Sequence, residues 1–390
     1  MSARLSVSIV GAGIGGLTAA LALLRAGHAV RVYEQAQQIR EVGAGLTLTP
    51  NATRVLTALG LGPTLERIGS VPCRGAVLHW RTGAELVENT RASDLAAKYG
   101  APYCQVHRAD LHGALLQSVA ALDPAAVRLN ARLVDLEPDS QPVAARFENG
   151  LEIRTDLLVG ADGIRSAVRT SLFGCEQPRF TGQVAWRGLV PATLLGEMPL
   201  EPPSALAIGP DRIFTRYLLR SGSLINFVAI VRSRGSGIES WSSLGRRDEL
   251  VAAYRDWHAT VRAIIAAIPP QSLYKWALFD RPPLPTWNRG RCTLLGDAAH
   301  PMLPFLGQGA AMAIEDGCVL ARAMAAGKDP AEGLRRYEIA RWRRTTEVAA
   351  NSRLAGERLQ NADTDRYTRA THVSAVSLDL PGYDATQVPV

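Results

Sequence analysis

The chain has 390 residues and a mass of 41.9 kDa. This length exceeds the usual size of a single hydrophobic core, so it predicts two lobes. Hydrophobic residues make up 47% and charged residues 20%, a balance that excludes disordered, collagen-like and fibrous chains. The net charge is +7, but the basic residues are spread out and no basic stripe alternates with aromatic side chains. Nucleic-acid binding is therefore not expected.

The five cysteines are widely spaced and include no CxxC pair. They form neither a disulfide framework nor a metal site, which predicts a protein without a bound metal in a reducing cytoplasm. Residues 5–24 are apolar, yet four glycines interrupt them and no positive cluster precedes them. No other stretch approaches the length of a membrane span, so we expect a soluble protein that does not enter the membrane. The cysteines are Cys73, Cys104, Cys175, Cys292 and Cys318.

The chain opens with the pattern of a βαβ unit. Ser6–Val10 is rich in β-forming residues, residues 17–26 have helical composition, and Ala29–Tyr33 is a second short strand. The glycine pattern Gly-x-Gly-x-x-Gly lies between the first strand and the helix, where it allows a tight turn and close approach of the backbone to a pyrophosphate. The acidic Glu34 closes the second strand, where its carboxylate would accept ribose hydroxyls.

This unit predicts a dinucleotide site, although the motif alone does not distinguish FAD from NAD and could also be a structural turn. The free N–H groups and positive dipole end of the helix favour phosphate. The expected cofactor contacts are Gly11, Gly13, Ile14, Gly15, Gly16 and Glu34.

Further along the chain the patterns alternate between buried strands, helices and β-rich stretches. Leu157–Gly160 and residues 292–295 have the composition of buried strands, each followed by Gly and Asp. Between about residues 176 and 279, period-two stretches at 213–219 and 224–231 predict an antiparallel sheet. Helices are predicted at 51–59, 109–122 and 309–326, with one or two more at 331–360 and an irregular segment after residue 361. The dense run of arginines at 335–344 is predicted to form a solvated helix face.

Two later motifs decide the cofactor. The first runs from Leu157 to Ser166 and contains Gly-Ala-Asp-Gly; the second, Leu-Leu-Gly-Asp-Ala-Ala-His-Pro at 294–301, is followed by Gly-Gln-Gly-Ala-Ala at 307–311. Together with the amino-terminal unit and Arg108, they resemble the FAD-dependent aromatic hydroxylases, which are single-component flavoprotein monooxygenases. The resemblance covers most of residues 5–345 and is greatest to the branch of salicylate, 3-hydroxybenzoate and 6-hydroxynicotinate hydroxylases.

The resemblance implies an α/β (α+β) fold, with a glutathione-reductase-type Rossmann domain for FAD, an interleaved mixed or antiparallel substrate sheet and carboxyl-terminal helices. We expect residues 1–72, 105–175 and 280–328 in the FAD domain, and 73–104 and 176–279 in the substrate domain. Residues 329–362 would form the carboxyl-terminal helices and 363–390 an extended tail. A monomer or homodimer is expected.

The resemblance also assigns residues to FAD, which would be tightly but non-covalently bound. Asp297 would bond a ribityl hydroxyl, Asp162 would lie near the pyrophosphate, and Arg108 would contact the ribityl–phosphate region. For both aspartates the alternative is ordinary turn chemistry. A helix that begins near Gly309 would direct N–H groups at the flavin N1 and C2 carbonyl. The remaining expected contacts are Ala44, Gly45, Pro301, Gly307, Ala310 and Ala311.

The implied reaction is reduction of FAD by NADH or NADPH, addition of O2 at flavin C4a, and oxygen transfer from the hydroperoxide to an electron-rich ring. The expected substrate is a small phenolic or hydroxy-N-heteroaromatic acid; the alternative within the class is a larger or neutral aromatic or polyketide-like ring. Outside the class, a flavin-binding redox partner and a nicotinamide-dependent dehydrogenase remain open. A flavin halogenase is disfavoured because the Trp-x-Trp-x-Ile-Pro run is absent.

Substrate contacts follow less directly, because Thr47, Ile213 and Phe305 replace histidines of related hydroxylases. By strand alternation Ile213, Thr215 and Tyr217 share one face. Tyr217 is the first choice for a substrate-activating phenol, with a packed core tyrosine as the alternative. The carbonyl of Pro304 could accept a substrate hydroxyl, or the proline could shape a loop. Arg187 could bind a carboxylate with two hydrogen bonds, or be a structural arginine.

Overall fold

The computed structural model describes residues 4–39, 44–233, 243–361 and 363–390. The predicted βαβ unit begins the chain, and its two strands are the centre of a five-stranded parallel sheet with the order β18-β11-β1-β2-β7. These strands are nearly continuous apolar runs because helices and a second sheet cover both faces. In that order they span Cys292–Leu294, Leu157–Gly160, Ser6–Val10, Ala29–Tyr33 and Val127–Arg128.

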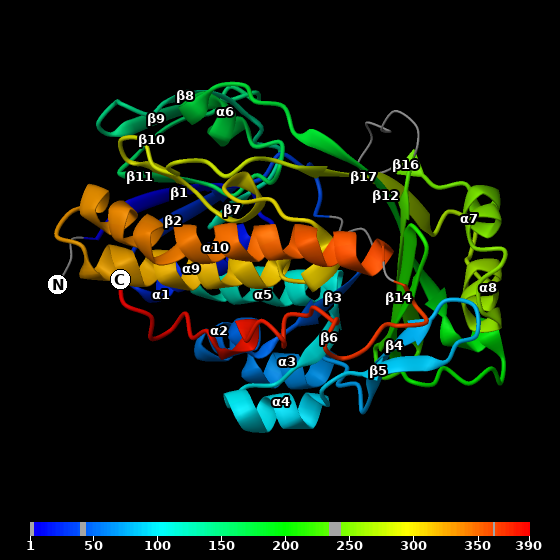
Figure 1. Cartoon of the computed structure of the whole chain (residues 1–390). Helices are drawn as coiled ribbons and strands as arrows, with labels where there is room; N and C mark the ends of the chain where they lie inside the picture. The colour runs from blue at the N-terminus through cyan, green and yellow to red at the C-terminus, as the bar shows by residue number, and fades with distance from the viewer. Residues whose placement is uncertain (1–3, 40–43, 234–242, 362) are drawn as a thin grey trace.

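Three layers build this half of the molecule. Helices α1 (Ile14–Arg25), α5 (Arg108–Leu122) and α9 (Gly309–Ala326) lie on one side of the parallel sheet, and α10 (Pro330–Gln360) packs against α9. A three-stranded antiparallel sheet covers the other side (Figure 1). Its strands β8, β9 and β10 span Leu133–Glu137, Val143–Phe147 and Glu152–Thr155.

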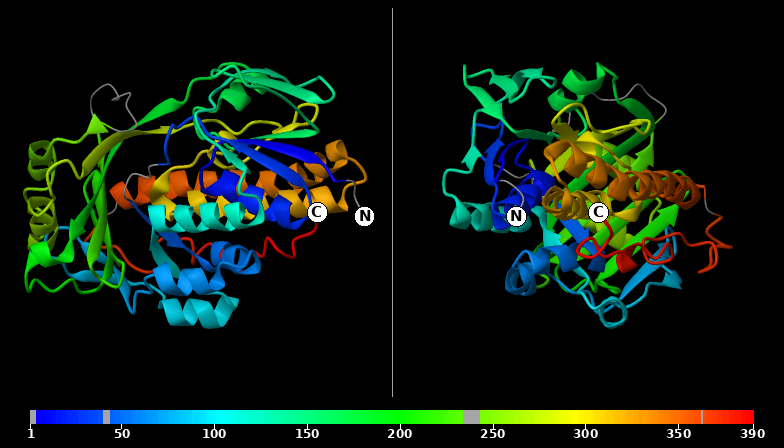
Figure 2. Two further views of the ribbon diagram at one scale, coloured as in Figure 1. Left: turned by 180° about the vertical axis from the view of Figure 1, so that it is seen from behind. Right: turned by 90° about the vertical axis from the view of Figure 1, so that its left-hand side faces the viewer.

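The other half is an eight-stranded mixed sheet with the order β16-β17-β12-β15-β14-β13-β4-β5. Every neighbouring pair is antiparallel except β13 and β4. Helices α7 (Arg247–Ala253) and α8 (Ala259–Ala266) cover its outer face, as both side views show (Figures 1 and 2). In sheet order the strands span Ser243–Leu244, Leu273–Asp280, Arg179–Pro191, Leu224–Arg232, Arg212–Leu219, Ser204–Gly209, Gly75–His79 and Glu85–Glu88.

Short elements connect the two halves. Strand β3 (Gly45–Leu48) pairs with β6 (Cys104–His107). The remaining α-helices are α2 (Pro50–Ala58), α3 (Gly62–Ile68), α4 (Ala92–Tyr99) and α6 (Ala167–Phe173), and short 3-10 turns span Ala192–Leu195, Gly296–Ala298, Pro304–Leu306 and Leu380–Gly382.

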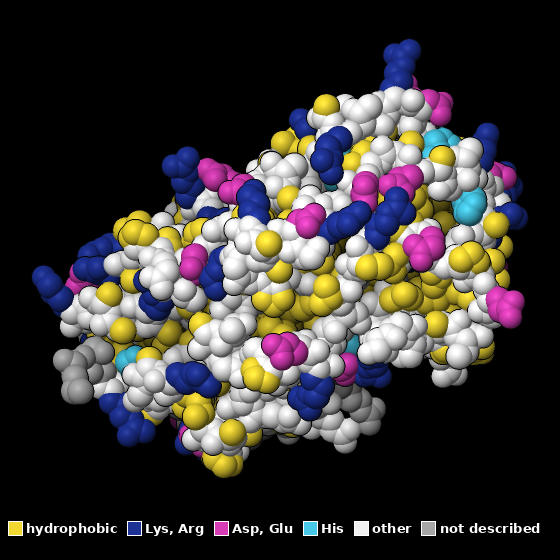
Figure 3. Space-filling view, turned by 90° about the horizontal axis from the view of Figure 1, so that it is seen from below, with side chains coloured by type: hydrophobic (Ala, Val, Ile, Leu, Met, Phe, Trp, Pro, Cys, Tyr) yellow, Lys and Arg dark blue, Asp and Glu magenta, His cyan; other side chains and the backbone are white. Residues whose placement is uncertain are grey.

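The strands and long helices predicted from sequence are confirmed to within a few residues, and the segment after α9 is one helix of 31 residues. The predicted domain boundaries stay a prediction. The described helices include none that is both long and apolar enough to cross a bilayer. On the face seen from below, acidic and basic side chains are interspersed around hydrophobic ones (Figure 3).

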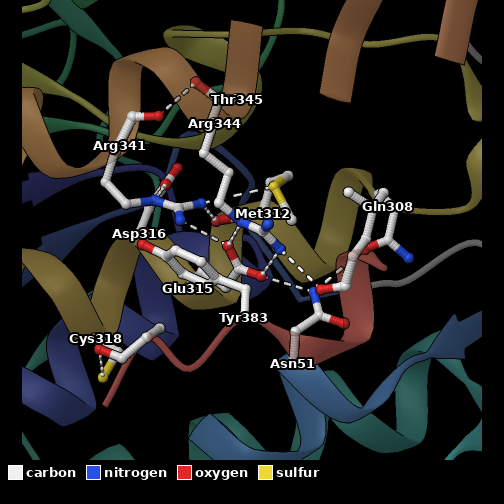
Figure 4. Close-up of polar contacts among 12 residues, drawn as sticks. Asn51, Gln308, Met312, Glu315, Asp316, Cys318, Arg341, Arg344, Thr345 and Tyr383 are labelled. Atoms are coloured by element: carbon white, nitrogen blue, oxygen red, sulfur yellow. Dashed lines mark hydrogen bonds and ion pairs between the residues drawn. The ribbon is translucent and has the colours of Figure 1, made fainter. Parts of the chain in front are cut away.

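The expectation of a solvated arginine face on α10 is only partly right, because Arg335 and Arg343 are exposed but Arg341 is not. Arg341 is completely buried, with Nε 2.7 Å from Asp316 Oδ1 and Nη1 2.6 Å from Glu315 Oε2 (Figure 4). Both acids lie on α9, and their side chains are also 0% exposed. Arg341 on α10 therefore neutralises two acidic side chains that the packing of α9 removes from water.

Further contacts extend this buried charge cluster, which we define as Glu315, Asp316, Arg341 and Arg344. Arg344 Nε lies 2.8 Å from Glu315 Oε2, and its guanidinium stacks 3.8 Å from the centre of the Tyr383 ring. Burial would raise the pKa of Asp316, but the charges of His300 and Arg341 outweigh it and hold that pKa at about 2. Asp316 thus stays ionised inside the protein.

Replacing Arg341 with Met should lower the free energy of unfolding by about 3–5 kcal/mol, because it leaves two buried carboxylates without their shared cation. Arg343→Met on the same helix is the matched control. Its side chain is 86% exposed, so its thermal unfolding should match that of the parent chain. Denaturant titrations of both variants provide the measurement, and equal stabilities would contradict the structural role of the cluster.

Candidate active site

A cavity of about 760 Å³ lies between the two halves. The inner face of the eight-stranded sheet forms its floor. The amino-terminal turns of α1 and α9 close one side, and β3, β6 and the turn at Pro304–Leu306 close another. This is the position expected for a ligand in an α/β fold, beyond the carboxyl ends of the parallel strands.

One row of register partners crosses the floor of the cavity. Each neighbouring strand from the sheet edge to β12 contributes one residue. Because these residues lie directly opposite one another in the register, their side chains share one face. Arg187 is the charged member at one end, and apolar side chains dominate the other end. In order the row is Val87, Val77, Leu206, Thr215, Val228 and Arg187.

The glycine turn has the shape needed for a pyrophosphate. A Cβ on Gly16 would lie 2.0 Å from the carbonyl oxygen of Gly11, so glycine is required for the helix to approach the strand. A Cβ on Gly13, in contrast, would meet no atom within 4 Å, and Gly13 lines the cavity. The space that a side chain would fill beside the start of α1 is thus open to a phosphate.

Two charged residues face each other near this end of the cavity. Burial lowers the pKa of Arg108, and the charge of Asp297 acts in the opposite direction. Burial raises the pKa of Asp297, which the charges of His300 and Arg108 oppose. The first turn of α9 contains no acidic residue, so the N–H groups beginning at Gly309 keep their positive dipole end free for an electron-rich group.

Arg187 presents a cation to the cavity. Its guanidinium lies 4.9 Å from the centre of the Trp276 ring, and its Nε has no hydrogen-bond partner among the described residues. Burial lowers its pKa, and the nearby charge of Arg108 has the same effect. A buried cation in this state gains most from an anionic ligand that binds it with two hydrogen bonds.

Tyr217 lies at the centre of the floor. Strand alternation is confirmed here, because Ile213, Thr215 and Tyr217 line the cavity while the Arg216 guanidinium turns away and donates to the carbonyl of Pro202. Burial raises the pKa of Tyr217, against the charge of Arg187 and a hydrogen bond with Thr47. Its phenol is therefore neutral at physiological pH and can both donate and accept a hydrogen bond.

Gly45 allows this position of Tyr217. A Cβ on Gly45 would lie 2.5 Å from the Tyr217 ring, and the Gly45 N–H donates to Asn226 Oδ1 at 2.7 Å. Tyr217 and Asn226 are register partners on β14 and β15. The start of β3 is thereby fixed onto the substrate sheet, beside the cavity.

Sequence reasoning missed several lining residues. Tyr103 lies near Thr47 and Gln105, whose hydrogen bonds oppose the rise of its pKa on burial. Gln105 Nε2 also donates to Ser204 Oγ at 3.0 Å. The pairing of Thr47 with Gln105 between β3 and β6 would have identified these residues. It could not be predicted, because each strand has only four residues and the two lie far apart in the sequence.

The structure brings most of the predicted residues to the cavity but not all. Asp162 lies outside the lining, between Ala161 and Gly163, which belong to it, and its Oδ2 accepts the Ala167 N–H at the start of α6 at 2.7 Å. Glu34 accepts the N–H groups of Ala12 and Ala36 at 2.8 and 2.9 Å. The predicted residues that line the cavity are Gly13, Ile14, Gly15, Gly45, Thr47, Arg108, Arg187, Ile213, Thr215, Tyr217, Asp297, Pro304, Phe305, Gly307, Gly309 and Ala310. Those that lie outside its lining are Gly11, Gly16, Glu34, Ala44, Asp162, Pro301 and Ala311.

Known proteins share this architecture. The family described as FAD binding domain matches residues 4–352. A 3-amino-4-hydroxybenzoate 2-monooxygenase of Streptomyces platensis is 41% identical over 364 residues, which are 93% of this chain and 90% of the relative. A 6-hydroxynicotinate 3-monooxygenase of Bordetella bronchiseptica is 36% identical over 352 residues, 89% of this chain and 90% of the relative.

Among solved structures, that of Klebsiella pneumoniae HpxO with FAD and uric acid superposes with a TM-score of 0.85 and 28% identity, covering 98% of this chain and 96% of that one. FAD is therefore the cofactor. The similarity extends over both halves, which disfavours a dehydrogenase or a redox partner without a substrate domain. The chain belongs to the family of FAD-dependent aromatic hydroxylases.

Proposed function

We propose that this FAD-dependent monooxygenase hydroxylates an aromatic acid that also carries a ring hydroxyl, of the phenolic or hydroxy-N-heteroaromatic type. The observation that carries the proposal is the buried Arg187 guanidinium, which faces the cavity beside Tyr217 with its Nε unpartnered among the described residues. An anionic substituent bound there places the ring over Tyr217. The two relatives named above are described as acting on hydroxylated aromatic acids.

The residues at the α1 and α9 end would hold FAD. The amino-terminal turn of α1 at Gly13 would bind the pyrophosphate, Asp297 and Arg108 the ribityl region, and the start of α9 at Gly309 the flavin ring. Glu34 retains free lone pairs for ribose hydroxyls beside its two backbone bonds. Bound FAD, reduced by NADH or NADPH, would supply the activation of O2, and O2 would provide the oxygen atom that is transferred.

Gly13→Ala tests the cofactor end. The methyl group would enter open space, so thermal unfolding of the apoprotein should not change, while the Kd for FAD should rise about tenfold or more. Gly16→Ala is the matched control: its methyl group would overlap the Gly11 carbonyl, so it should destabilise the apoprotein itself. Flavin titration with circular dichroism separates the two effects, and parent-like FAD affinity in Gly13→Ala would argue against this assignment.

Arg187 would bind the carboxylate and thereby orient the ring. The apolar row between Arg187 and the sheet edge excludes water, which strengthens this charge-assisted contact. Trp276 below the guanidinium fixes its plane at a ring distance of 4.9 Å. Arg187 therefore acts as a positioning residue for the atom to be oxidised.

Arg187→Gln should raise KM for 3-hydroxybenzoate and 6-hydroxynicotinate by about tenfold to a hundredfold, corresponding to the loss of a charged hydrogen bond. Affinity for FAD should stay at the parent value. Arg179→Gln, on the same strand with a 71% exposed side chain, is the control and should leave KM unchanged. NADH consumption stimulated by each acid gives the values; unchanged KM in Arg187→Gln would refute the anchor.

Tyr217 would accept a hydrogen bond from the substrate hydroxyl and so increase the electron density of the ring. Thr47 and Tyr103 extend the hydrogen-bonded group next to the phenol. The carbonyl of Pro304 receives the Gly307 N–H at 3.1 Å and retains a second lone pair for the same hydroxyl. Ile213, Thr215 and Phe305 would supply walls that exclude water from the reacting ring.

Tyr217→Phe should keep folding and FAD binding but lower hydroxylation by about tenfold to a thousandfold. The consumed O2 should appear increasingly as hydrogen peroxide, because an unactivated ring accepts oxygen slowly. Tyr254→Phe is the control: its hydroxyl bonds the Ile213 carbonyl at 2.8 Å on the opposite face, so stability should fall while coupling persists. Product and peroxide are measured together, and parent-like coupling in Tyr217→Phe would exclude its role.

We also propose that the enzyme works in the reducing cytoplasm as a monomer or homodimer. Five unpaired cysteines, three of them buried, support this location, as does the use of a nicotinamide co-substrate.

A further inference from the structure

The cavity continues past the ring site toward the edge of the sheet. The six-residue row on its floor crosses five strand spacings, from Val87 on β5 to Arg187 on β12. At about 4.8 Å per spacing, the row is about 24 Å long. A single aromatic ring held by its carboxylate at Arg187 covers less than half of that distance, so the part over β13, β4 and β5 lies beyond it.

The tail of the chain forms the wall of this outer part. After α10 the chain turns back, and the residues that line the cavity there are Arg369, His372, Val373, Ser374, Ala375, Val376 and Ser377. Figure 1 shows this red segment passing the sheet edge near β5 and β6 before it crosses α2. This tail shows no regular sequence pattern, and we expected only an extended segment.

Contacts at both ends hold the wall in place. Tyr367 is 8% exposed, belongs to the same apolar cluster as Val77 and Val87, and its hydroxyl lies 2.9 Å from His372 Nδ1. Arg369 Nη2 donates to the Glu88 carbonyl at 3.1 Å. On the other side, the Leu380 carbonyl accepts from Arg344 and the Val388 carbonyl from Arg322. A segment fixed in this way is a permanent part of the cavity.

The floor of this outer compartment is apolar, and its rim carries polar side chains, among them Asn89, Ser374 and Ser377. Val77 and Val87 are buried in its floor, Leu95 and Leu206 lie beside them, and Val373 and Val376 face it from the tail. The exposed polar side chains Glu88, Thr90 and Arg369 also line this part of the cavity. Burial and the charge of Arg369 lower the pKa of His372, so its imidazole adds no cation at neutral pH.

We propose that this compartment is a second subsite, which binds an apolar extension of the substrate: a fused ring, aryl group or alkyl chain on the side of the ring remote from the carboxylate. The inference rests on the proposed function, since it takes Arg187 as the anchor. It places the determinant of substrate size in the tail, on Val373 and its neighbours, at the opposite end of the row from the carboxylate site.

Two acids test the subsite in the FAD-loaded enzyme: 3-hydroxybenzoate and 3-hydroxy-5-phenylbenzoate, whose binding is followed by perturbation of the flavin absorbance. The parent enzyme should bind the phenyl acid about tenfold or more tightly than the one-ring acid, because the added ring is buried. Val373→Trp, which fills the compartment, should abolish that preference and change the affinity for 3-hydroxybenzoate less than about threefold. Ala370→Trp, an exposed tail residue outside the lining, should retain both affinities.

The outcomes separate the two proposals. Equal affinities for the two acids in the parent enzyme, or a preference retained in Val373→Trp, would overturn the subsite and leave the proposed function standing. If Val373→Trp slows binding of both acids equally without changing their affinity ratio, the compartment is an access channel and the subsite is refuted. Absence of any flavin perturbation by either acid would overturn the proposed function and the subsite with it.

Thiol protection gives a second test that does not depend on the folding of a tryptophan variant. Cys73 and Cys175 are the exposed cysteines among those described, so both are replaced by Ser before Ser374→Cys is introduced. The phenyl acid should slow modification of this thiol by methyl methanethiosulfonate at least about fivefold, whereas 3-hydroxybenzoate should not. Ala370→Cys should react at one rate throughout; equal rates for Ser374→Cys with and without the phenyl acid would contradict the subsite.

Discussion

The buried charge cluster between α9 and α10 is the interaction on which the geometry of the site depends. Asp316 accepts the Gly296 N–H at 3.0 Å and so holds the turn that carries Asp297. Glu315 accepts Asn51 Nδ2 at 2.6 Å, and Asn51 in turn contacts Gln308, the residue before α9. Unpaired charges in the interior cost free energy. The turn at Gly296, the start of α2 and the start of α9 are therefore held in the one arrangement that gives both buried carboxylates their partners.

The same cluster connects the cofactor end of the cavity with the tail. The Tyr383 ring stacks on the guanidinium of Arg344, whose Nη2 donates to the Leu380 carbonyl at 3.1 Å. The tail is therefore attached to α10 at Leu380 and Tyr383. Its earlier part lies against the sheet edge, where Arg369 bonds the Glu88 carbonyl. These contacts lie outside the lining of the cavity, yet they hold the segment that forms its outer wall.

Local patterns were sufficient for much of the fold. The apolar run Ser6–Val10, the glycine turn after it and the long helix Gly309–Ala326 each carry a periodic or conformational signal within a few residues. The alternation on β14 placed Ile213, Thr215 and Tyr217 on one face for the same reason. Short elements such as α3 and β10 were missed because their apolar positions are too few to establish a period.

Contacts between residues that are far apart in the chain could not be predicted from the sequence. The partners of Arg341 lie on the preceding helix, and an arginine-rich run has the same composition whether it is solvated or neutralised. Asp162 follows a strand and precedes a glycine, a pattern that serves a cofactor and a helix cap equally, and its carboxylate caps α6. Tyr103 depends on the pairing of β3 with β6, which tertiary packing alone decides.

The cavity combines two electrostatic environments in one space. The charge of Arg108 adds to burial in lowering the pKa of the Arg187 guanidinium, as expected of like charges in a medium of low polarity. Between them and the sheet edge the floor is apolar. Such a gradient orients a ligand that has one anionic end before any specific hydrogen bond forms.

The interleaving of the two halves also determines the order in which their sheets can form during synthesis. β1 ends at Val10, but β18, which completes the parallel sheet, begins at Cys292. β18 pairs with β11, so at ribosomal speed the sheet that β1 begins waits on the order of tens of seconds for its last strand. The substrate sheet closes before then, because its strands lie between residues 75 and 280. The nucleotide-binding half therefore begins first and finishes last, and the edge of β11 that receives β18 stays without its partner until then.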